Sequence, residues 1–265
     1  MPQGGFGNRV LSYLSLRMIA QTLSAPYFSI NKTDRRLIDG IHKPLLVPMR
    51  LRNVVELPKE APRQEDFLGK VEPLLDDGAT VVLKSPQLGE AYARYANVDP
   101  AQMVAHHFTL CATHRREAAG HSTTVLHLRG TDFAQWNPYA ILGQDYYRDA
   151  LELLGSRTEG HLFRICTDDP SHASLGPVVA HLQATGRRVS SAQCSQPFEC
   201  DFAAMTGARF LISSPSTFSI SAGLLGNAAV VHSQRWVDNR LEREELFWEQ
   251  VSRNALVGLD VAGLV

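Results

Sequence analysis

Residues 123–132 read TTVLHLRGTD, a short apolar run that ends in a histidine, an arginine and an aspartate. The first six residues have the β-branched and aliphatic composition of a buried strand. Arg129 and Asp132 follow almost at once. Charged groups are costly to place beside a hydrophobic core, so a charged cluster here calls for a reason. We therefore expect this strand to end at a functional site.

Outward from this stretch, predicted strands and helices alternate. The strands cover 123–128, 162–167, 188–191, 209–213 and 228–232. The helices cover 144–154, 171–184, 198–206, 216–225 and 240–253. Short apolar strands that alternate with helices are typical of a parallel sheet covered on both faces. The sequence thus predicts an α/β fold, whose ligands bind beyond the carboxyl ends of the strands.

The first half of the chain is less regular. Apolar residues at helical spacing predict a helix over 9–24, with Asn8 as its N-cap. A strand is predicted over 80–83 and a helix over 99–117, whereas the proline-rich residues 31–75 should form loops and short helices. The regular alternation begins after AAGH at 118–121, which predicts two domains, residues 1–119 and 120–265.

Composition excludes several classes of protein. The 265 residues are 44% hydrophobic and 20% charged, with a net charge of -1, so no nucleic-acid partner is expected. No apolar stretch reaches the length of a bilayer span, and residues 1–10 lack the apolar region of a signal peptide, so we expect neither feature. Four cysteines without a CxxC pair predict free buried thiols. We predict a cytoplasmic protein, and leave open contact with a membrane surface and the oligomeric state.

Three polar clusters follow three of the predicted strands. They are His127-Leu128-Arg129-Gly130-Thr131-Asp132, Thr167-Asp168-Asp169-Pro170 and Ser213-Ser214-Pro215-Ser216-Thr217. An arginine neutralises phosphate, a helix N-terminus attracts anions, and a carboxylate accepts hydrogen bonds from guanine or ribose. The sequence contains neither GxxxxGK[ST] nor GxGxxG after a strand. The clusters therefore predict a site for a nucleoside diphosphate outside those two motif classes.

Each cluster also has a purely local explanation. Asp132 can cap a helix or pair with Arg129, the TDDP sequence suits a strand-to-helix turn, and the serines suit helix capping. The functional interpretation rests on the three clusters together. His106, His107 and His114 lack an acidic companion motif, so we predict no metal site.

Four ordered motifs resemble the superfamily of α1,2-, α1,6- and protein O-fucosyltransferases. Residues 127–132 resemble its HxRRxD motif, and residues 167–170 are similar to the TDDP motif of the α1,6 branch. Residues 201–219 resemble the third motif, and residues 4–9 the GGxGN opening of the α1,2 enzymes. The resemblance covers residues 4–20 and about 120–226.

The resemblance implies a GT-B-like fold of two Rossmann-like halves with parallel sheets, here with an abbreviated N-terminal half. The donor would bind to the C-terminal half, and a glycan acceptor would lie in the cleft on the side of the N-terminal half. The implied reaction is inverting transfer of L-fucose from GDP-fucose, with no metal and no further cofactor.

The resemblance and the strand-end clusters also imply residue roles. Arg129 would bind the β-phosphate and stabilise the leaving GDP, and Asp201 would accept hydrogen bonds from guanine. The nucleotide-sugar pocket would comprise His127, Arg129, Asp168, Asp201, Ser214, Ser216, Thr217 and Phe218. Gly5, Gly7, Asn8 and Arg9 would line the cleft from the N-terminal half. Arg129 and Asp132 are the catalytic candidates.

The chain departs from the family pattern at two places. Gly130 replaces the second arginine of HxRRxD, and residues 133–137 carry no acid that could serve as a general base. Asp132 is the nearest carboxylate, although its family counterpart is structural. Three alternatives stay open: a different nucleotide-sugar donor, a non-catalytic protein that binds sugar nucleotides or glycans, and a metal-dependent enzyme that uses Asp168 and Asp169.

Overall fold

The structure is a computed structural model of the 265-residue chain. It describes residues 5–8, 10, 19, 22–24, 38–39, 53–58, 61, 66–83, 109–110, 122–131, 141–190, 197–226 and 228–232. The chain divides into two compact units, Met1–Thr109 and Leu110–Val265. The division falls before the boundary expected at residues 119 and 120. Each unit is described by itself below.

The second unit is built on five parallel strands in the order β7-β6-β5-β8-β9. These strands are β5 (Thr123–Leu128), β6 (Leu162–Thr167), β7 (Arg188–Val189), β8 (Phe210–Ile212) and β9 (Ala229–Val231). From β5 the chain adds strands outward through β6 to β7, then returns to the other side of β5 with β8 and β9. The strand order therefore reverses between β5 and β8, which is where sheets of this type bind ligands.

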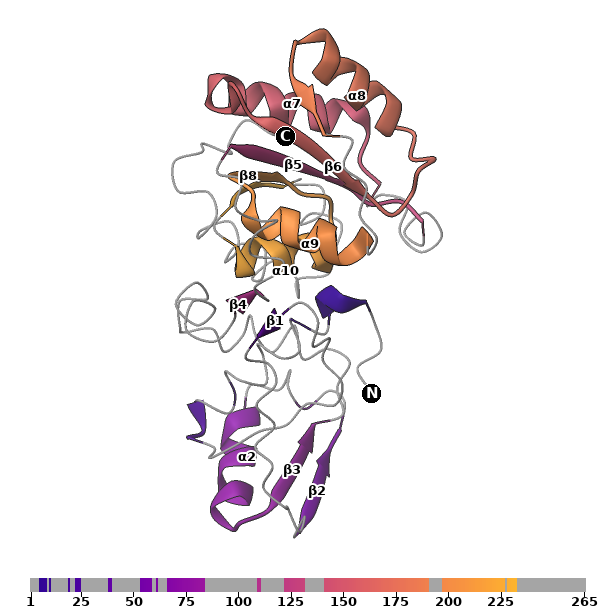
Figure 1. The fold of residues 1–265 in the computed structure, drawn as a ribbon. Helices are drawn as coiled ribbons and strands as arrows, with labels where there is room; N and C mark the ends of the chain where they lie inside the picture. The colour runs from indigo at the N-terminus through magenta and orange to yellow at the C-terminus, as the bar shows by residue number, and fades with distance from the viewer. Residues whose placement is uncertain are drawn as a thin grey trace. The chain divides into compact units, whose positions relative to one another are not determined.

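Four α-helices of this unit cover the sheet. They are α7 (Gln144–Leu154), α8 (Leu175–Ala184), α9 (Pro197–Gly207) and α10 (Thr217–Leu225), and the 3₁₀-helix η3 (Gly155–Thr158) follows α7. Helices α7 and α8 lie on one face, and α9 and α10 lie on the other (Figure 1). The predicted α/β class, a parallel sheet covered on both faces, is confirmed for this unit, and its strand order is Rossmann-like.

The central strand β5 is buried on both faces, and all its residues except Thr123 are buried. Leu126 and Leu128 pack in one apolar cluster with Tyr147 and Leu151 of α7. Because side chains alternate along a strand, His127 points to the opposite face, toward α10. Packing on both faces thus holds β5 in place, and β5 in turn positions Arg129 and Gly130, which follow it.

Predicted and observed elements agree closely along this unit. The bounds of β5, α7 and β6 are those expected, α9, β8, α10 and β9 shift by at most one residue at either end, and β7 ends two residues earlier than expected. Helix α8 starts at Leu175 rather than at residue 171, because the residues before it form hydrogen-bonded turns, among them His172 N–H to Asp169 O at 3.0 Å. The helix predicted over 240–253 lies outside the described residues.

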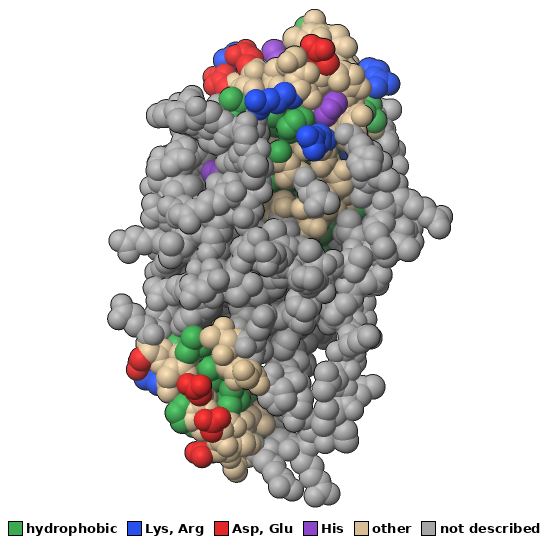
Figure 2. Space-filling view, turned by 90° about the vertical axis from the view of Figure 1, so that its left-hand side faces the viewer, with side chains coloured by type: hydrophobic (Ala, Val, Ile, Leu, Met, Phe, Trp, Pro, Cys, Tyr) green, Lys and Arg blue, Asp and Glu red, His purple; other side chains and the backbone are tan. Residues whose placement is uncertain are grey.

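The described part of the first unit contains a β-α-β segment. Strand β2 (Val54–Leu57) pairs in parallel with β3 (Thr80–Leu83), and α2 (Phe67–Asp76) connects them. Phe67 and Val71 of α2 face a small core, and Figure 2 shows acidic side chains on its outer face. The exposed acids there are Asp66, Glu72, Asp76 and Asp77. The short strands β1 (Ile38–Asp39) and β4 (Thr109–Leu110) form a further two-stranded sheet.

Several predictions for the first half were wrong. Residues 6–8 are already helical, so Asn8 lies within the helix instead of capping it. Strand β2 lies within residues 31–75, where only loops and short helices were expected. Thr109 and Leu110 form β4, not part of a helix over 99–117. These elements are short, and their packing partners are distant in sequence, so local pattern did not reveal them.

The two cysteines that the structure describes are in different states. Cys166 is buried and free, as predicted, but Cys200 is disulfide-bonded, so the prediction of free thiols was wrong there. Sequence spacing could not reveal which thiols meet in the fold. Disulfides persist mainly in oxidising compartments, so the cysteines no longer support a cytoplasmic location. Within the part of the chain that the structure describes, no helix is long and apolar enough to cross a bilayer.

Two glycines of the second unit give a direct test of how closely α9 and the end of α10 pack. A Cβ at Gly226 would lie 2.3 Å from the backbone oxygen of Thr206, whereas a Cβ at Gly176 in α8 would meet no atom within 4 Å. Gly226→Ala should lower the free energy of unfolding by about 1–3 kcal/mol, because backbone must move. Gly176→Ala should raise it by up to about 1 kcal/mol, through helix propensity. Urea denaturation of both variants measures this; equal effects would contradict the α9–α10 packing.

Candidate functional site

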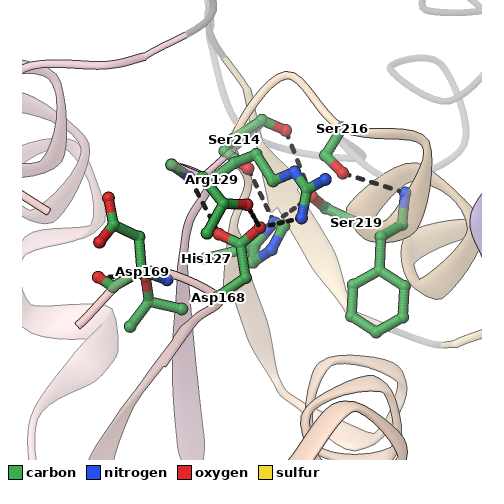
Figure 3. Close-up of polar contacts among 11 residues, drawn as sticks. His127, Arg129, Asp168, Asp169, Ser214, Ser216 and Ser219 are labelled. Carbon is green, nitrogen blue, oxygen red and sulfur yellow. Dashed lines mark hydrogen bonds and ion pairs between the residues drawn. The ribbon is translucent and has the colours of Figure 1, made fainter. Parts of the chain in front are cut away.

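The polar clusters predicted from sequence meet at the carboxyl ends of the central strands. Arg129 follows β5, Asp168 follows β6, and Ser214 and Ser216 follow β8. Because the strand order reverses between β5 and β8, Arg129 and the two serines flank the reversal point. Figure 3 shows the Arg129 side chain extending from the strand end toward Asp168.

The carboxylate of Asp168 joins the ends of β5 and β6. It accepts a hydrogen bond from the guanidinium of Arg129 in an ion pair. It also accepts from the backbone N–H of Gly130 at 3.0 Å and from the hydroxyl of Thr131 at 2.6 Å. Three consecutive residues therefore direct a donor at one carboxylate. The Arg129 and Asp168 side chains are 24% and 28% exposed, so a ligand can reach them.

These donors hold Asp168 in its charged form. Burial by itself raises the pKa of its carboxyl group, but the hydrogen bonds from Thr131 and Gly130 and the charge of Arg129 together lower it. Asp169 lies next in the chain, and its Oδ1 accepts from the Ser171 backbone N–H at 2.9 Å and the Ser171 hydroxyl at 2.6 Å. The ends of β5 and β6 thus present two carboxylates and one guanidinium among the described residues.

Gly130 is needed for this arrangement. A Cβ at residue 130 would lie 2.5 Å from the Cβ of Asp169 and 2.5 Å from its Oδ2, closer than atoms can approach. The missing side chain lets the backbone N–H of Gly130 come close enough to bond Asp168. The position of the second arginine in the pattern HxRRxD, which is Gly130 in this chain, therefore has no room for a side chain beside Asp169.

His127 lies beneath this cluster and is only 4% exposed. Its Nδ1 is 2.5 Å from the Ser219 hydroxyl and 2.7 Å from the Ser214 hydroxyl, so it links β5 to the loop before α10 and to α10 itself. Burial is the main reason that the pKa of His127 falls to about 4. The imidazole is therefore neutral at neutral pH, and it orders two serines instead of supplying charge to a ligand.

Ser216 begins α10 as its N-cap. Its hydroxyl accepts from the Phe218 backbone N–H at 3.2 Å, and Thr217 is the first helical residue. The positive end of the α10 dipole thus lies after β8. The ring of Phe218 packs against His127 and Phe202, with centroids 5.9 and 5.2 Å apart.

Asp201 belongs to a different cluster. Its carboxylate accepts from Arg164 at 3.1 Å and interacts with the Cys166 thiol, both within β6. Burial raises the pKa of Asp201, against the effect of these two neighbours. Among the described residues, the contacts of Asp201 are with Arg164 and Cys166, and none is with Arg129, Asp168 or Ser216. Cys166 itself lies opposite His127 in the register of β5 and β6. Its role toward guanine stays a prediction.

The other predicted residues are placed as follows. Asp132 and Arg9 lie outside the described residues. Gly5, Gly7 and Asn8 belong to the first unit, so their part in a cleft stays a prediction. The described residues contain no group of three or more histidines, cysteines or acids that could hold a metal ion.

Sequence reasoning missed three contributors. Thr131 binds Asp168, Ser219 binds His127, and the Tyr147 hydroxyl donates to the backbone oxygen of His127 at 3.1 Å. Thr131 and Ser219 lie inside the quoted motifs, so their position was a usable signal. Nothing in the sequence around Tyr147 distinguishes it from an ordinary core aromatic residue.

These features define an α/β unit with a parallel sheet that has an arginine, two serines, one of them a helix N-cap, and a carboxylate at the reversal of its strand order. Comparisons of the whole chain with models of protein families, with curated proteins and with solved structures found no match. The function of the chain therefore has to be argued from the site.

The fit between Gly130 and Asp169 can be measured. Gly130→Ala should lower the free energy of unfolding by about 1–3 kcal/mol, because the new Cβ collides with the Asp169 Cβ. When Gly130→Ala is made in the Asp169→Gly variant, its cost should be smaller by about 1 kcal/mol, because the Asp169 Cβ that obstructs residue 130 is absent. Asp169→Ala is the matched control, because it removes the Cγ and Oδ2 contacts but keeps the Asp169 Cβ, and it should therefore give less relief than Asp169→Gly. Equal costs in all three backgrounds would contradict the close approach.

Burial of His127 should appear as a dependence of stability on pH. The folded pKa, about 4, lies below the ordinary value of 6.5, so between these values the unfolded chain binds a proton that the folded chain does not. Stability should therefore fall as the pH drops from 6.5 toward 4. By pH 4.5 this residue should account for roughly 2–3 kcal/mol.

The measurement is urea unfolding at pH 7 and pH 4.5 for the wild-type protein and His127→Asn. Asn keeps a polar atom near Nδ1 but does not titrate in this range. The variant should lose less stability between the two pH values than the wild type. If both lose the same amount, His127 is not buried and neutral as described.

Proposed function

We propose that the second unit binds the diphosphate of a nucleotide sugar, and that the chain is a glycosyltransferase of GT-B type. The reaction proposed is inverting transfer of L-fucose from GDP-fucose to a glycan acceptor. The observation that carries the proposal is Arg129: a guanidinium, 24% exposed, at the carboxyl end of the central strand. It lies at the point where parallel sheets of this type bind ligands.

The chemistry of the cluster supports a phosphate ligand. Arginine binds phosphate through charge-assisted hydrogen bonds, and the N-terminus of α10 favours negative charge. Ser214, Ser216 and Thr217 surround that helix start and supply hydroxyl groups. In this proposal His127 acts indirectly, because its contacts with Ser214 and Ser219 fix the loop before α10.

In the proposed reaction, the acceptor hydroxyl oxygen forms a bond to the anomeric carbon of the sugar. The bond from that carbon to the β-phosphate oxygen breaks, and GDP leaves with its electron pair. Arg129 and the α10 N-terminus would stabilise the charge that develops on this oxygen. The hydroxyl proton passes to a base, for which Asp132 stays the candidate, and Asp201 stays the candidate for guanine.

A second candidate function is binding of a sugar nucleotide or glycan without transfer. Two observations favour it. The carboxylates of Asp168 and Asp169 already accept hydrogen bonds, so neither is a ready base. The position of the second family arginine is closed by Asp169, so the site has less positive charge than the motif implies. The same loss of charge also favours a donor other than GDP-fucose.

The proposal predicts that Arg129→Ala weakens GDP binding by about 10- to 100-fold, because the variant loses one or two charge-assisted hydrogen bonds to phosphate. Isothermal titration calorimetry of the full chain measures this. Arg148→Ala on α7 is the matched control, since it removes the same charge from an exposed pair with Asp145 and should leave binding unchanged.

A wild-type protein that binds no GDP, or an Arg129→Ala variant that binds equally well, would refute the proposal. Released nucleotide, assayed with GDP-fucose and a panel of other nucleotide sugars, separates the remaining candidates. Release with another donor only would correct the sugar assignment. GDP binding without release, on any acceptor glycan tried, would favour the second candidate.

A further inference from the structure

The turn at residues 129–131 has the donor set of an anion-binding site. A guanidinium, a backbone N–H and a hydroxyl converge on one carboxylate, that of Asp168. Proteins bind phosphate with the same combination of arginine, backbone N–H groups and hydroxyls. The anion in this turn is supplied by the protein itself. We call Arg129, Gly130 and Thr131 the anion cradle.

The cradle lies where a ligand is expected to bind. It follows the central strand at the reversal of strand order, and the N-terminus of α10 follows the neighbouring strand. With Asp168 in place, however, the guanidinium is already neutralised, and Asp169 adds a second negative charge nearby. Among the described residues at these strand ends, one guanidinium then stands against two carboxylates and its donors are in use, so these residues would repel a diphosphate. The site would become favourable only if Asp168 left it.

We propose that the Asp168 carboxylate occupies the seat of a ligand phosphate in the anion cradle, and that a diphosphate ligand binds by displacing it. This rests on the proposed function only in that the ligand carries phosphate; it requires neither fucose nor group transfer. Asp168 then acts as an internal competitor that sets affinity, and not as a ligand-binding residue. The displaced carboxylate returns when the ligand leaves.

The turn that carries Asp168 can release this side chain and keep its shape. Thr167 Oγ1 accepts from the Asp169 backbone N–H at 3.1 Å and donates to the Asp169 backbone oxygen at 3.2 Å. Ser171 binds the Asp169 carboxylate through its backbone and its hydroxyl. None of these bonds involves the Asp168 carboxylate. Rotation of Asp168 therefore costs its own three hydrogen bonds and no others in the turn.

The proposal predicts that Asp168→Asn binds inorganic pyrophosphate more tightly than the wild type. The amide keeps the size of the side chain but gives up the ion pair with Arg129, so the gain should be about tenfold or more. Calorimetry on the full chain at fixed ionic strength measures it. Asp149→Asn, on the exposed side of α7, makes the same charge change elsewhere and should leave pyrophosphate affinity unchanged.

Equal or weaker pyrophosphate binding by Asp168→Asn would overturn the proposal. It would mean that Asp168 either binds the ligand or serves only to join the two strand ends. An equal gain in Asp149→Asn would also overturn it, since the effect would then be general charge.

A second measurement needs no variant, which matters if Asp168→Asn folds poorly. The side-chain carboxyl carbon of Asp168 in the wild-type protein is followed by NMR as the pH is varied, with and without pyrophosphate. Displacement removes the donors that lower the pKa of Asp168, so pyrophosphate should raise that pKa. An unchanged pKa, or one that falls further, would overturn the proposal.

The two proposals fail in different ways. If Asp168→Asn gains pyrophosphate affinity but no nucleotide sugar is bound or cleaved, the cradle is correct and the glycosyltransferase proposal is not. If wild type releases GDP from GDP-fucose but Asp168→Asn gains no affinity, the transferase proposal holds and displacement is wrong.

Discussion

One carboxylate, that of Asp168, determines what the end of the central strand can do. It joins β5 to β6 by accepting from three consecutive residues, and it neutralises the only arginine among the described residues at these strand ends. The sheet makes this contact possible, because β5 and β6 pair in parallel register as far as Leu128 and Thr167. Their carboxyl ends therefore finish side by side. The site depends on this register, and the register depends on burial of β5 from both faces.

The lack of a side chain at Gly130 determines which groups can bind at the end of β5. From the sequence alone, a glycine in place of an arginine looks like a lost positive charge. In the structure it is the residue that lets the turn approach Asp169 and direct its backbone N–H at Asp168. The donors at this strand end come from a backbone group and a hydroxyl as well as a guanidinium. This strand end therefore holds the Asp168 carboxylate through hydrogen bonds of fixed direction as well as through charge, and the displacement proposal assigns the same donors to a phosphate.

The sequence predicted most of the second unit, since its elements carry their own signals. Strand β5 is an apolar run bounded by charge, and α7 has helical spacing between two glycines that flank it. In the first unit, β2 and β4 depend on pairing with residues far along the chain, so no local pattern identified them. For the site, sequence placed Arg129, Asp168 and Ser216 at strand ends that do converge. It could not reveal that Asp168 binds Arg129 instead of a ligand, because pairing between side chains depends on the fold.

The polar groups beneath the strand ends are more buried than Arg129 and Asp168, and they bond to other parts of the protein. His127 is buried and neutral, and its bonds to Ser214 and Ser219 hold the start of α10 in place. Arg164 and Asp201 form a largely buried ion pair on the same face, so these two charges beneath the strand ends are already paired with each other. The exposed charges of the cradle are then the ones able to exchange partners. In the displacement that we propose, the Asp168 carboxylate would leave the cradle while the hydrogen bonds of His127 with Ser214 and Ser219 stay in place. Arg129 is thus paired with Asp168 and is still 24% exposed, as the displacement proposal requires.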